Sequence, residues 1–178
     1  MEMKERYPRL EINLAHLKHN VAKVVEKCGS YGIQVAGVIK GATGLPEVAK
    51  QFDEGGAAFI ASSRLEQIED ARNAGIEKPM MLIRIPMLSE VEDVIRLADI
   101  SLNSELEVIK ALNDEARKQG KLHKVILMAD MGDLREGYWD KEEMADVAEY
   151  IENKMINIQL VGIGTNVGCY GSIAPTVE

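Results

Sequence analysis

The sequence predicts an α/β fold of the (β/α)8, or TIM-type, barrel class. Short apolar runs rich in β-branched residues alternate with segments of helical periodicity from residue 14 onward. Runs this short and this continuously apolar are typical of parallel strands covered on both faces. Each run also leads into a polar or chargeable residue, and such barrels carry their functional residues at the carboxyl ends of the strands.

Six runs have the length and composition of buried strands. They are Gln34–Ile39, Ala57–Ala61, Met80–Ile85, Asp99–Leu102, Lys124–Ala129 and Ile158–Ile163. The polar residues that close them are Lys40, Ser62, Arg84, Asn103, Asp130 and the pair Thr165-Asn166. Strands that alternate with helices at short intervals predict a parallel sheet with right-handed crossovers.

The segments between these runs have the spacing and the end signals of helices. Apolar stripes occur within 14–24, 45–52, 91–98 and 144–151. Three capping boxes predict helix starts, and they are Ser63 with Glu66, Ser89 with Glu92, and Ser104 with Glu107. Four glycines predict helix ends, and they are Gly32, Gly55, Gly75 and Gly120.

A doubly wound open sheet is the alternative to a barrel. It would gather its ligand contacts at one switch point, usually with a phosphate loop, whereas polar residues here follow every run. We therefore favour the barrel. Complete barrels typically need about 250 residues. We expect residues 1–178 to be the amino-terminal part of a barrel domain, truncated after about six β/α units and without a C-terminal domain.

Composition excludes several classes of partner. The 21 basic and 29 acidic residues give a net charge of −8, which opposes nonspecific binding to nucleic acid. No apolar run approaches the roughly 18 residues of a membrane span, and no signal-peptide stretch occurs at the start. Cys28 and Cys169 match no metal or redox spacing, and the three histidines form no zinc pattern. We expect a cytoplasmic protein that binds no metal, nucleic acid or membrane.

Lys40 is the first candidate for chemistry, because it follows a buried strand and precedes Gly41-Ala-Thr-Gly44. A lysine amine in the mouth of a barrel is partly desolvated, which leaves more of the neutral amine to attack an aldehyde. The glycines allow a bulky ligand to approach the backbone. Taken alone, the pattern fits a solvated loop lysine slightly better. The spacing matches neither a P-loop nor a dinucleotide-binding fingerprint.

Two later loops carry further candidates. The loop 130–137 places Arg135 among acids and glycines, where its guanidinium could donate to a phenolate or carboxylate. A salt bridge between Arg135 and Asp130, Asp133 or Glu136 is about equally consistent with the sequence. The glycine-rich segment 162–171 supplies hydrogen-bonding groups at Thr165 and Asn166, and is weak evidence by itself.

Three motifs in this order resemble the fold-type III pyridoxal-phosphate racemases, the alanine racemase type. They are Leu10-Glu-Ile-Asn-Leu14 followed by Val38-Ile-Lys40, then Asp130-x-Gly132-x-x-Arg135-x-Gly137, then Gly162-Ile-Gly-Thr165. The motifs extend over nearly the whole chain and lie on the corresponding strand ends. The resemblance implies pyridoxal 5'-phosphate as cofactor, a small-molecule amino acid as substrate and a homodimer in the intact protein.

The resemblance also implies roles for individual residues. Lys40 would form the internal aldimine with the cofactor and act as one acid/base. Arg135 would donate to the phenolic oxygen of the cofactor, Asn166 would lie against its ring, and Thr165 belongs to the same cofactor-binding segment. The family's second base is a tyrosine from a C-terminal domain of the partner subunit, and its phosphate-binding loops follow strands seven and eight. We therefore expect this 178-residue piece alone to be inactive and to bind the cofactor weakly.

Departures from the alanine racemase pattern bear on the substrate. Met128 stands where many alanine racemases have a carbamylated lysine, Gly44 replaces a tyrosine, and Asn166 replaces a histidine. Together with Val-Ile-Lys-Gly-Ala-Thr-Gly, these features resemble the ornithine racemase branch. The expected activity is racemisation of ornithine or another diamino acid, with alanine less favoured.

Two other functions fit parts of the pattern. A cofactor carrier of the related pyridoxal phosphate homeostasis family would bind the cofactor at Lys40 without exchanging substrate α-protons. A class I aldolase is also a barrel enzyme with a Schiff-base lysine. In aldolases the lysine usually lies on a later strand, and the first-strand position of Lys40 argues against that function.

Overall fold

The computed structural model describes residues 9–168, in which helices and strands alternate along the chain. The strands are β1 (Ala36–Val38), β2 (Phe59–Ser62), β3 (Met80–Leu82), β4 (Ile100–Asn103), β5 (His123–Ala129) and β6 (Ile158–Thr165). The α-helices are α1 (Leu14–Gly29), α2 (Pro46–Glu54), α3 (Leu65–Asn73), α4 (Val91–Leu97), α5 (Leu106–Lys118) and α6 (Lys141–Lys154). Short 3-10 helices, η1 (Lys40–Ala42) and η2 (Leu88–Glu90), follow β1 and precede α4. All six predicted strands are therefore confirmed, with ends shifted by up to three residues.

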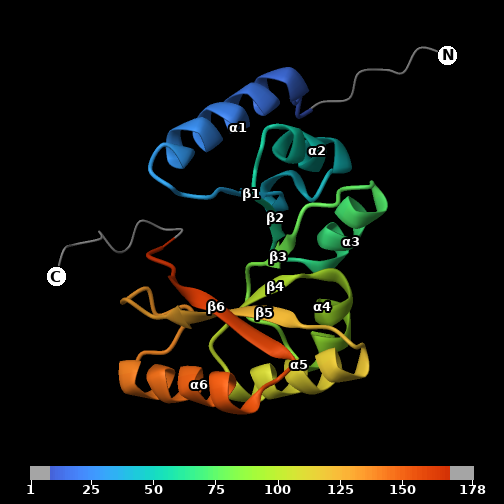
Figure 1. Ribbon diagram of the computed structural model, residues 1–178. Helices are drawn as coiled ribbons and strands as arrows, with labels where there is room; N and C mark the ends of the chain where they lie inside the picture. The colour runs from blue at the N-terminus through green and yellow to red at the C-terminus, as the bar shows by residue number, and fades with distance from the viewer. Residues whose placement is uncertain (1–8, 169–178) are drawn as a thin grey trace.

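The six strands form one parallel sheet whose spatial order is the order of the sequence, β1-β2-β3-β4-β5-β6. A doubly wound sheet would reverse its strand order at a switch point, so the sequential order decides for the barrel class. Figure 1 shows the helices from α2 to α6 following one another along one side of the curved sheet. The described residues therefore contain five β/α units and the sixth strand of a (β/α)8 barrel, with α1 ahead of the first strand.

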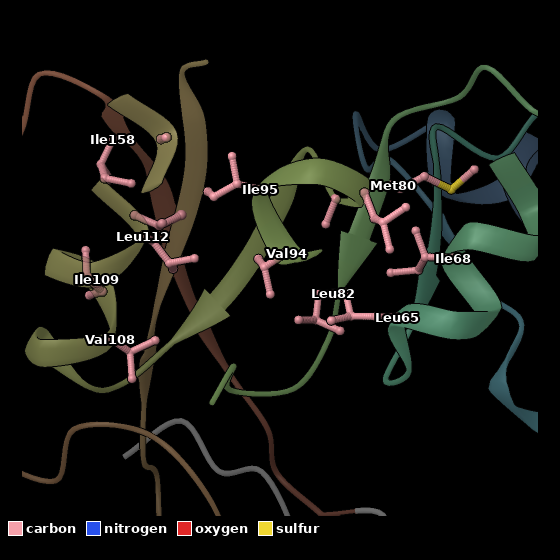
Figure 2. Packing of buried hydrophobic residues seen from close by; sticks show 14 of the residues in the cluster. Leu65, Ile68, Met80, Leu82, Val94, Ile95, Val108, Ile109, Leu112 and Ile158 are labelled. Carbon is pink, nitrogen blue, oxygen red and sulfur yellow. The ribbon is translucent and has the colours of Figure 1, made fainter. Parts of the chain in front are cut away.

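The helix-covered face of the sheet contains the core. Fully buried Ile60, Leu82 and Leu127 point from the strands toward helix residues such as Ile68 and Leu112. Figure 2 shows how these layers interdigitate. The labelled residues are Leu65, Ile68, Met80, Leu82, Val94, Ile95, Val108, Ile109, Leu112 and Ile158. Burial of this apolar layer is the main source of stability, at about 25 cal/mol per Å² removed from water.

The opposite, concave face of the sheet is defined by strand alternation. Val38 pairs with Ala61 and Ile126 pairs with Gly162, and Val38, Ala61 and Ile126 each lie one residue away from a member of the helix-facing core. Met128 is also on this face: a Cβ added to Gly164 would lie 3.0 Å from the Met128 sulfur. This is the face on which a barrel carries its interior residues and, at the carboxyl ends, its functional groups.

The helix starts differ from the predicted capping boxes. The N-caps of α3 and α5 are Arg64 and Glu105, neither with a side-chain cap, while Asn13 and Asp140 cap α1 and α6 through their side chains. Ser89 lies inside η2. The predicted boxes fail because each helix begins at a residue other than the predicted serine; before α3, for example, the Ser62 hydroxyl accepts from the Arg64 amide.

The stripe predicted for α1 is largely uncovered. Of its four apolar residues only Val21 is buried, and Val24 is 52% exposed. Val21 packs closely against Gly55 at the end of α2, where an added Cβ would lie 2.6 Å from a Val21 methyl group. Of the four glycines predicted at helix ends, Gly55 alone has a right-handed backbone, and Gly56 takes the positive φ there. Within residues 9–168, no helix combines the length and apolar character needed to cross a bilayer.

Candidate functional site

Three of the six strand-end polar residues do not contribute to a site on the concave face. Ser62 donates to Gln67 of α3 at 2.6 Å, and Asn103 donates to the Ser101 hydroxyl at 3.0 Å beneath the helices. Arg84 makes a bidentate ion pair with Glu90, with distances of 2.5 and 2.7 Å. The side chains of these three residues are therefore engaged in the scaffold.

The loop after β5 is closed by its own backbone. The Asp130 amide donates to the Tyr138 carbonyl at 3.0 Å, and the Tyr138 amide donates to the Met128 carbonyl at 2.8 Å. The Asp130 carboxylate accepts from the amides of Gly132 and Leu134, at 2.8 and 3.2 Å. Gly137 allows the closure, because it has φ +120° and any Cβ there would strike the Asp130 backbone.

Lys141, the first residue of α6, fixes the base of this loop. Its ammonium donates to the carbonyls of Asp130, Tyr138 and Trp139 at 2.7, 2.8 and 3.1 Å. Three carbonyl oxygens around one ammonium hold both ends of the loop against the helix. The result is a defined position for the two charged residues that the loop carries at 135 and 136.

Arg135 and Glu136 form a bidentate ion pair within the loop. Arg135 Nε donates to Glu136 Oε2 at 2.8 Å and Nη2 donates to Oε1 at 2.6 Å. The salt bridge that the sequence left open is therefore present, and its partner is Glu136. Asn166, just after β6, donates its amide to the same Oε1 at 3.3 Å. Two of the predicted site residues thus meet at a carboxylate that the sequence analysis did not select.

The groups around the Glu136 carboxyl lower its pKa. The hydrogen bond from Arg135 lowers this pKa most, and the hydrogen bond from Asn166 and the positive charge of Lys40 lower it further, while burial opposes them. Only 15% of the Glu136 side chain is exposed, against 44% for Arg135. Arg135 and Asn166 therefore meet at one partly buried carboxylate.

Lys40 follows β1, and its positive charge contributes to the lowered pKa of Glu136. The Ile39 amide continues the ladder to the Ala61 carbonyl at 2.9 Å, and the chain then turns through η1. Lys40 is exposed, so the partial burial expected of its amine is not found within residues 9–168. The turn ends at Gly44, with φ +77° and with Gln67 2.6 Å from the place of a Cβ, so the tyrosine of alanine racemases has no room there.

The side chains of Thr165 and Asn166 lie on opposite faces of the sheet. Thr165 pairs with Ala129, on the face opposite to Met128 and Gly164, and is exposed. Asn166 follows it with the opposite orientation, and its side-chain oxygen accepts from the Gly168 amide at 3.2 Å. Binding of the cofactor by Thr165 stays a prediction. The last three residues of the glycine-rich segment, with Cys169, lie outside the described residues.

Two of the cavities adjoin residues already described. One of about 500 Å³ opens at the carboxyl ends of the strands and is lined by Ile85, Glu105, Asp130, Arg135 and Glu136, among others. Another of about 400 Å³ lies at the amino ends of β4 and β5, next to His123. In the second cavity, Arg72 is paired with Asp99, Arg96 is paired with Glu69 and Asp93, and the Lys121 ammonium donates to two backbone carbonyls. The first cavity is therefore the one that adjoins the cluster around Glu136.

The histidines play no part in this cluster. His16 and His19 are exposed on α1. His123 is buried and lies 2.8 Å from the Ser101 hydroxyl, and burial lowers its pKa to about 4. Within residues 9–168, no three His, Cys, Asp or Glu side chains come together as a metal site would require.

Comparison with known proteins places the chain in a family. Residues 12–178 match the family described as alanine racemase, N-terminal domain. The chain belongs to this family. It is 40% identical to the ornithine racemase of Acetoanaerobium sticklandii over 95% of its own length and 47% of that protein. It is 38% identical to the lysine racemase of Thermotoga maritima, over 97% and 47% of the two chains.

A solved structure supports the fold. The alanine racemase from E. faecalis superposes with a TM-score of 0.75 at 21% identity, over 92% of this chain and 44% of that one. The resemblance that the three motifs predict is thereby confirmed, and the cofactor of the family is pyridoxal phosphate, as expected from the sequence. The chain spans about half the length of the curated relatives it matches.

The described residues fit this cofactor at its aldehyde and ring. A primary amine at Lys40, a guanidinium at Arg135 and an amide at Asn166 are the groups that an aldehyde and a phenolic oxygen require. The concave face of β6 adds Gly162, where an added Cβ would meet no atom within 4 Å. A flat ring can therefore approach this strand without displacing a side chain.

Proposed function

We propose that the protein is a pyridoxal-phosphate-dependent racemase that interconverts the L and D forms of a diamino acid, with ornithine as the first candidate. Residues 1–178 would form the amino-terminal part of its cofactor-binding barrel domain. The observation that supports this most is that Arg135 and Asn166 meet at Glu136 at the carboxyl ends of the strands, the same end at which Lys40 follows β1. These are the positions where a barrel enzyme binds its substrate.

Each residue has a role in this proposal. The amine of Lys40 would hold the cofactor, Arg135 would donate to its phenolic oxygen, and Asn166 would lie against its ring. When bound, the cofactor supplies an electron sink that makes the α-proton of the amino acid acidic. The Lys40 amine would take or return that proton on one face. Inversion requires a second acid/base on the other face, and we propose that the partner subunit of a homodimer contributes it.

The choice of a diamino acid rests on the relatives and on two positions. The ornithine and lysine racemases are 40% and 38% identical to this chain, whereas an alanine racemase of Caldanaerobacter subterraneus is 28% identical. Met128 and Asn166 replace residues that the alanine racemase pattern carries near the cofactor. We also propose the cytoplasm as the location, where Cys28 would stay a free thiol.

The assignment of Lys40 can be tested in the intact protein. After addition of pyridoxal phosphate and reduction with borohydride, peptide mass spectrometry should find the cofactor attached to Lys40. Lys40→Ala should abolish the stable adduct. Lys124→Ala is the matched control, because Lys124 lies on the same concave face near the opposite end of β5 and should leave the adduct intact. If Lys40→Ala keeps an undiminished adduct, the assignment is wrong.

The reaction can be tested separately by deuterium incorporation at the α-carbon. In D2O the intact protein should exchange the α-proton of ornithine faster than those of lysine and alanine, and should invert the configuration. An adduct at Lys40 without exchange of any amino acid would favour a cofactor carrier of the related homeostasis family. Fastest exchange with alanine would contradict the diamino-acid proposal and leave the racemase proposal standing.

A further inference from the structure

The cavity of about 500 Å³ at the carboxyl ends of the strands carries an excess of acidic groups. Its described lining contains the carboxylates of Glu105, Asp130 and Glu136 and the guanidinium of Arg135. Glu136 accepts two hydrogen bonds from Arg135. Glu105 and Asp130 therefore add negative charge to the wall formed by the ends of β4 and β5, which favours a positively charged group in the cavity.

Asp130 supplies a nearly buried acceptor to this wall. The residue is 8% exposed, and its Oδ1 atom accepts from the amides of Gly132 and Leu134. Within residues 9–168 its second carboxylate oxygen, Oδ2, has no hydrogen bond or ion pair. Burial of a carboxylate oxygen without a donor costs free energy. Because Asp130 lines the cavity, its Oδ2 atom favours a donor that enters there.

Two further oxygen acceptors in the lining come from the neighbouring strand end. Ser104 and Glu105 directly follow β4, which pairs with β5, and Asp130 directly follows β5. In the part of the chain that the structure describes, the Ser104 hydroxyl and the Glu105 carboxylate make no hydrogen bond or ion pair, and Glu105 does not cap α5. Ile85 and Leu134 add apolar side chains to the same lining. The cavity thus combines oxygen acceptors with an apolar part.

Resting on the proposed function, we infer that this wall binds the side-chain ammonium of a diamino-acid substrate, with Glu105 as the residue that determines specificity. A primary ammonium has three donors and no acceptor. Asp130 Oδ2, the Ser104 hydroxyl and the Glu105 carboxylate offer it oxygen acceptors and a charge of opposite sign. Arg135 lines the same cavity, which connects the wall with the residues proposed to hold the cofactor.

Glu105 is the member of the wall best suited to selecting the substrate. The Asp130 carboxylate also holds the loop that follows β5, so its substitution would disturb the loop as well as the cavity. Glu105 has no comparable structural hydrogen bond through its side chain within residues 9–168. The methylene groups of the substrate would contact Ile85 and Leu134, and these contacts do not depend on the charge at Glu105.

The test uses the intact protein loaded with pyridoxal phosphate and compares ornithine with norleucine, in which a methyl group replaces the side-chain ammonium. The change in absorbance of the bound cofactor during titration gives an apparent Kd for each amino acid without requiring turnover. The wild type should bind ornithine more tightly than norleucine. Glu105→Gln keeps the size of the side chain and should weaken ornithine binding about tenfold, while norleucine binding changes by less than about twofold.

Glu107→Gln is the matched control. Glu107 lies further along α5, its side chain is 75% exposed and it pairs with Lys110 at 2.8 Å, so both apparent Kd values should stay at the wild-type level. Equal weakening of both amino acids, or unchanged ornithine binding, in folded Glu105→Gln overturns the inference. If Glu105→Gln does not fold by circular dichroism, Ser104→Ala decides: it should weaken ornithine binding about threefold and leave norleucine unchanged, and an unmoved ornithine Kd overturns the inference.

The titration and the deuterium exchange separate this inference from the proposed function. If Glu105→Gln selectively weakens ornithine binding and no amino acid exchanges its α-proton, the racemase proposal fails and the ammonium site stands. If ornithine exchanges its α-proton and its binding does not respond to Glu105→Gln, the ammonium site fails alone. A wild-type protein whose cofactor absorbance does not respond to ornithine also overturns the ammonium site.

Discussion

The buried histidine at the start of β5 predicts a specific loss of stability in weak acid. His123 is 2% exposed, and burial lowers its pKa from 6.5 to about 4. The nearby charge of Asp99 and the hydrogen bond to the Ala98 backbone oppose this shift, and Lys121 reinforces it. The folded protein therefore holds His123 neutral at pH values where the unfolded chain protonates it.

The sign and size of the effect follow from linkage. Between pH 6.5 and about 4 the unfolded state binds more protons at this position, so the free energy of unfolding decreases as the pH falls. Each pKa unit corresponds to about 1.4 kcal/mol, and the full shift therefore to about 3 kcal/mol. The contribution is complete above pH 6.5 and is lost as the pH falls to about 4.

Urea unfolding at pH 4, 5, 6 and 7 measures this dependence. His123→Gln keeps a hydrogen-bonding group opposite the Ser101 hydroxyl and removes the titrating ring. Carboxylates titrate in both proteins, so the difference between their pH slopes isolates His123. We expect the slope to be shallower in His123→Gln by up to about 1 kcal/mol per pH unit. His16→Gln, at an exposed position on α1, is the control and should keep the wild-type slope. Equal slopes in wild type and His123→Gln would refute the reasoning.

Two further predictions concern the scaffold. Leu112→Ala removes a fully buried side chain from the layer between α5 and the sheet, and it should lower the free energy of unfolding in urea by about 2 to 5 kcal/mol. Leu122→Ala is the control: at a 58% exposed position it should change the free energy of unfolding by less than about 0.5 kcal/mol. Gly137→Ala places a Cβ against the Asp130 backbone at a φ that alanine disfavours. This variant should lower the melting temperature and weaken borohydride trapping of the cofactor at Lys40. Gly29→Ala, where an added Cβ meets no atom within 4 Å, should leave the trapping unchanged. Normal trapping in Gly137→Ala would contradict the role assigned to the loop.

The strands were predictable because their signal is local. A continuous apolar run carries its own information, as Ile158–Ile163 and Lys124–Ala129 do, and both are strands in the structure although Val161 and Ile163 are exposed. Helix starts were less predictable, because a side-chain oxygen that could cap a helix can also accept from donors in other parts of the fold. The Glu90 carboxylate illustrates this: it accepts from the Met87 amide and from Arg84, a residue outside its own helix.

The site was predictable at the positions that motifs mark and unpredictable where tertiary contacts decide. Lys40, Arg135 and Asn166 follow from strand ends and motif order, and the structure joins Arg135 and Asn166 through Glu136. Glu136 was visible only as one of several acids near Arg135. Selecting it requires the loop closure by Lys141 and the approach of β6, and both join residues that the sequence does not relate.

A register shift between β5 and β6 explains why Asn166, and not Thr165, reaches this cluster. Val125 pairs with Leu160, but Ile126 pairs with Gly162, so β6 contains one extra residue at Val161. Because side chains alternate along a strand, one extra residue exchanges the faces of everything after it. Without the shift, Thr165 would share the concave face with Met128 and Asn166 would point away. With the shift, Gly162 and Gly164 lie on the concave face and the Asn166 amide lies 3.3 Å from Glu136. The composition of the segment leaves both Thr165 and Asn166 as candidates, and the register shift decides that Asn166 lies on the concave face.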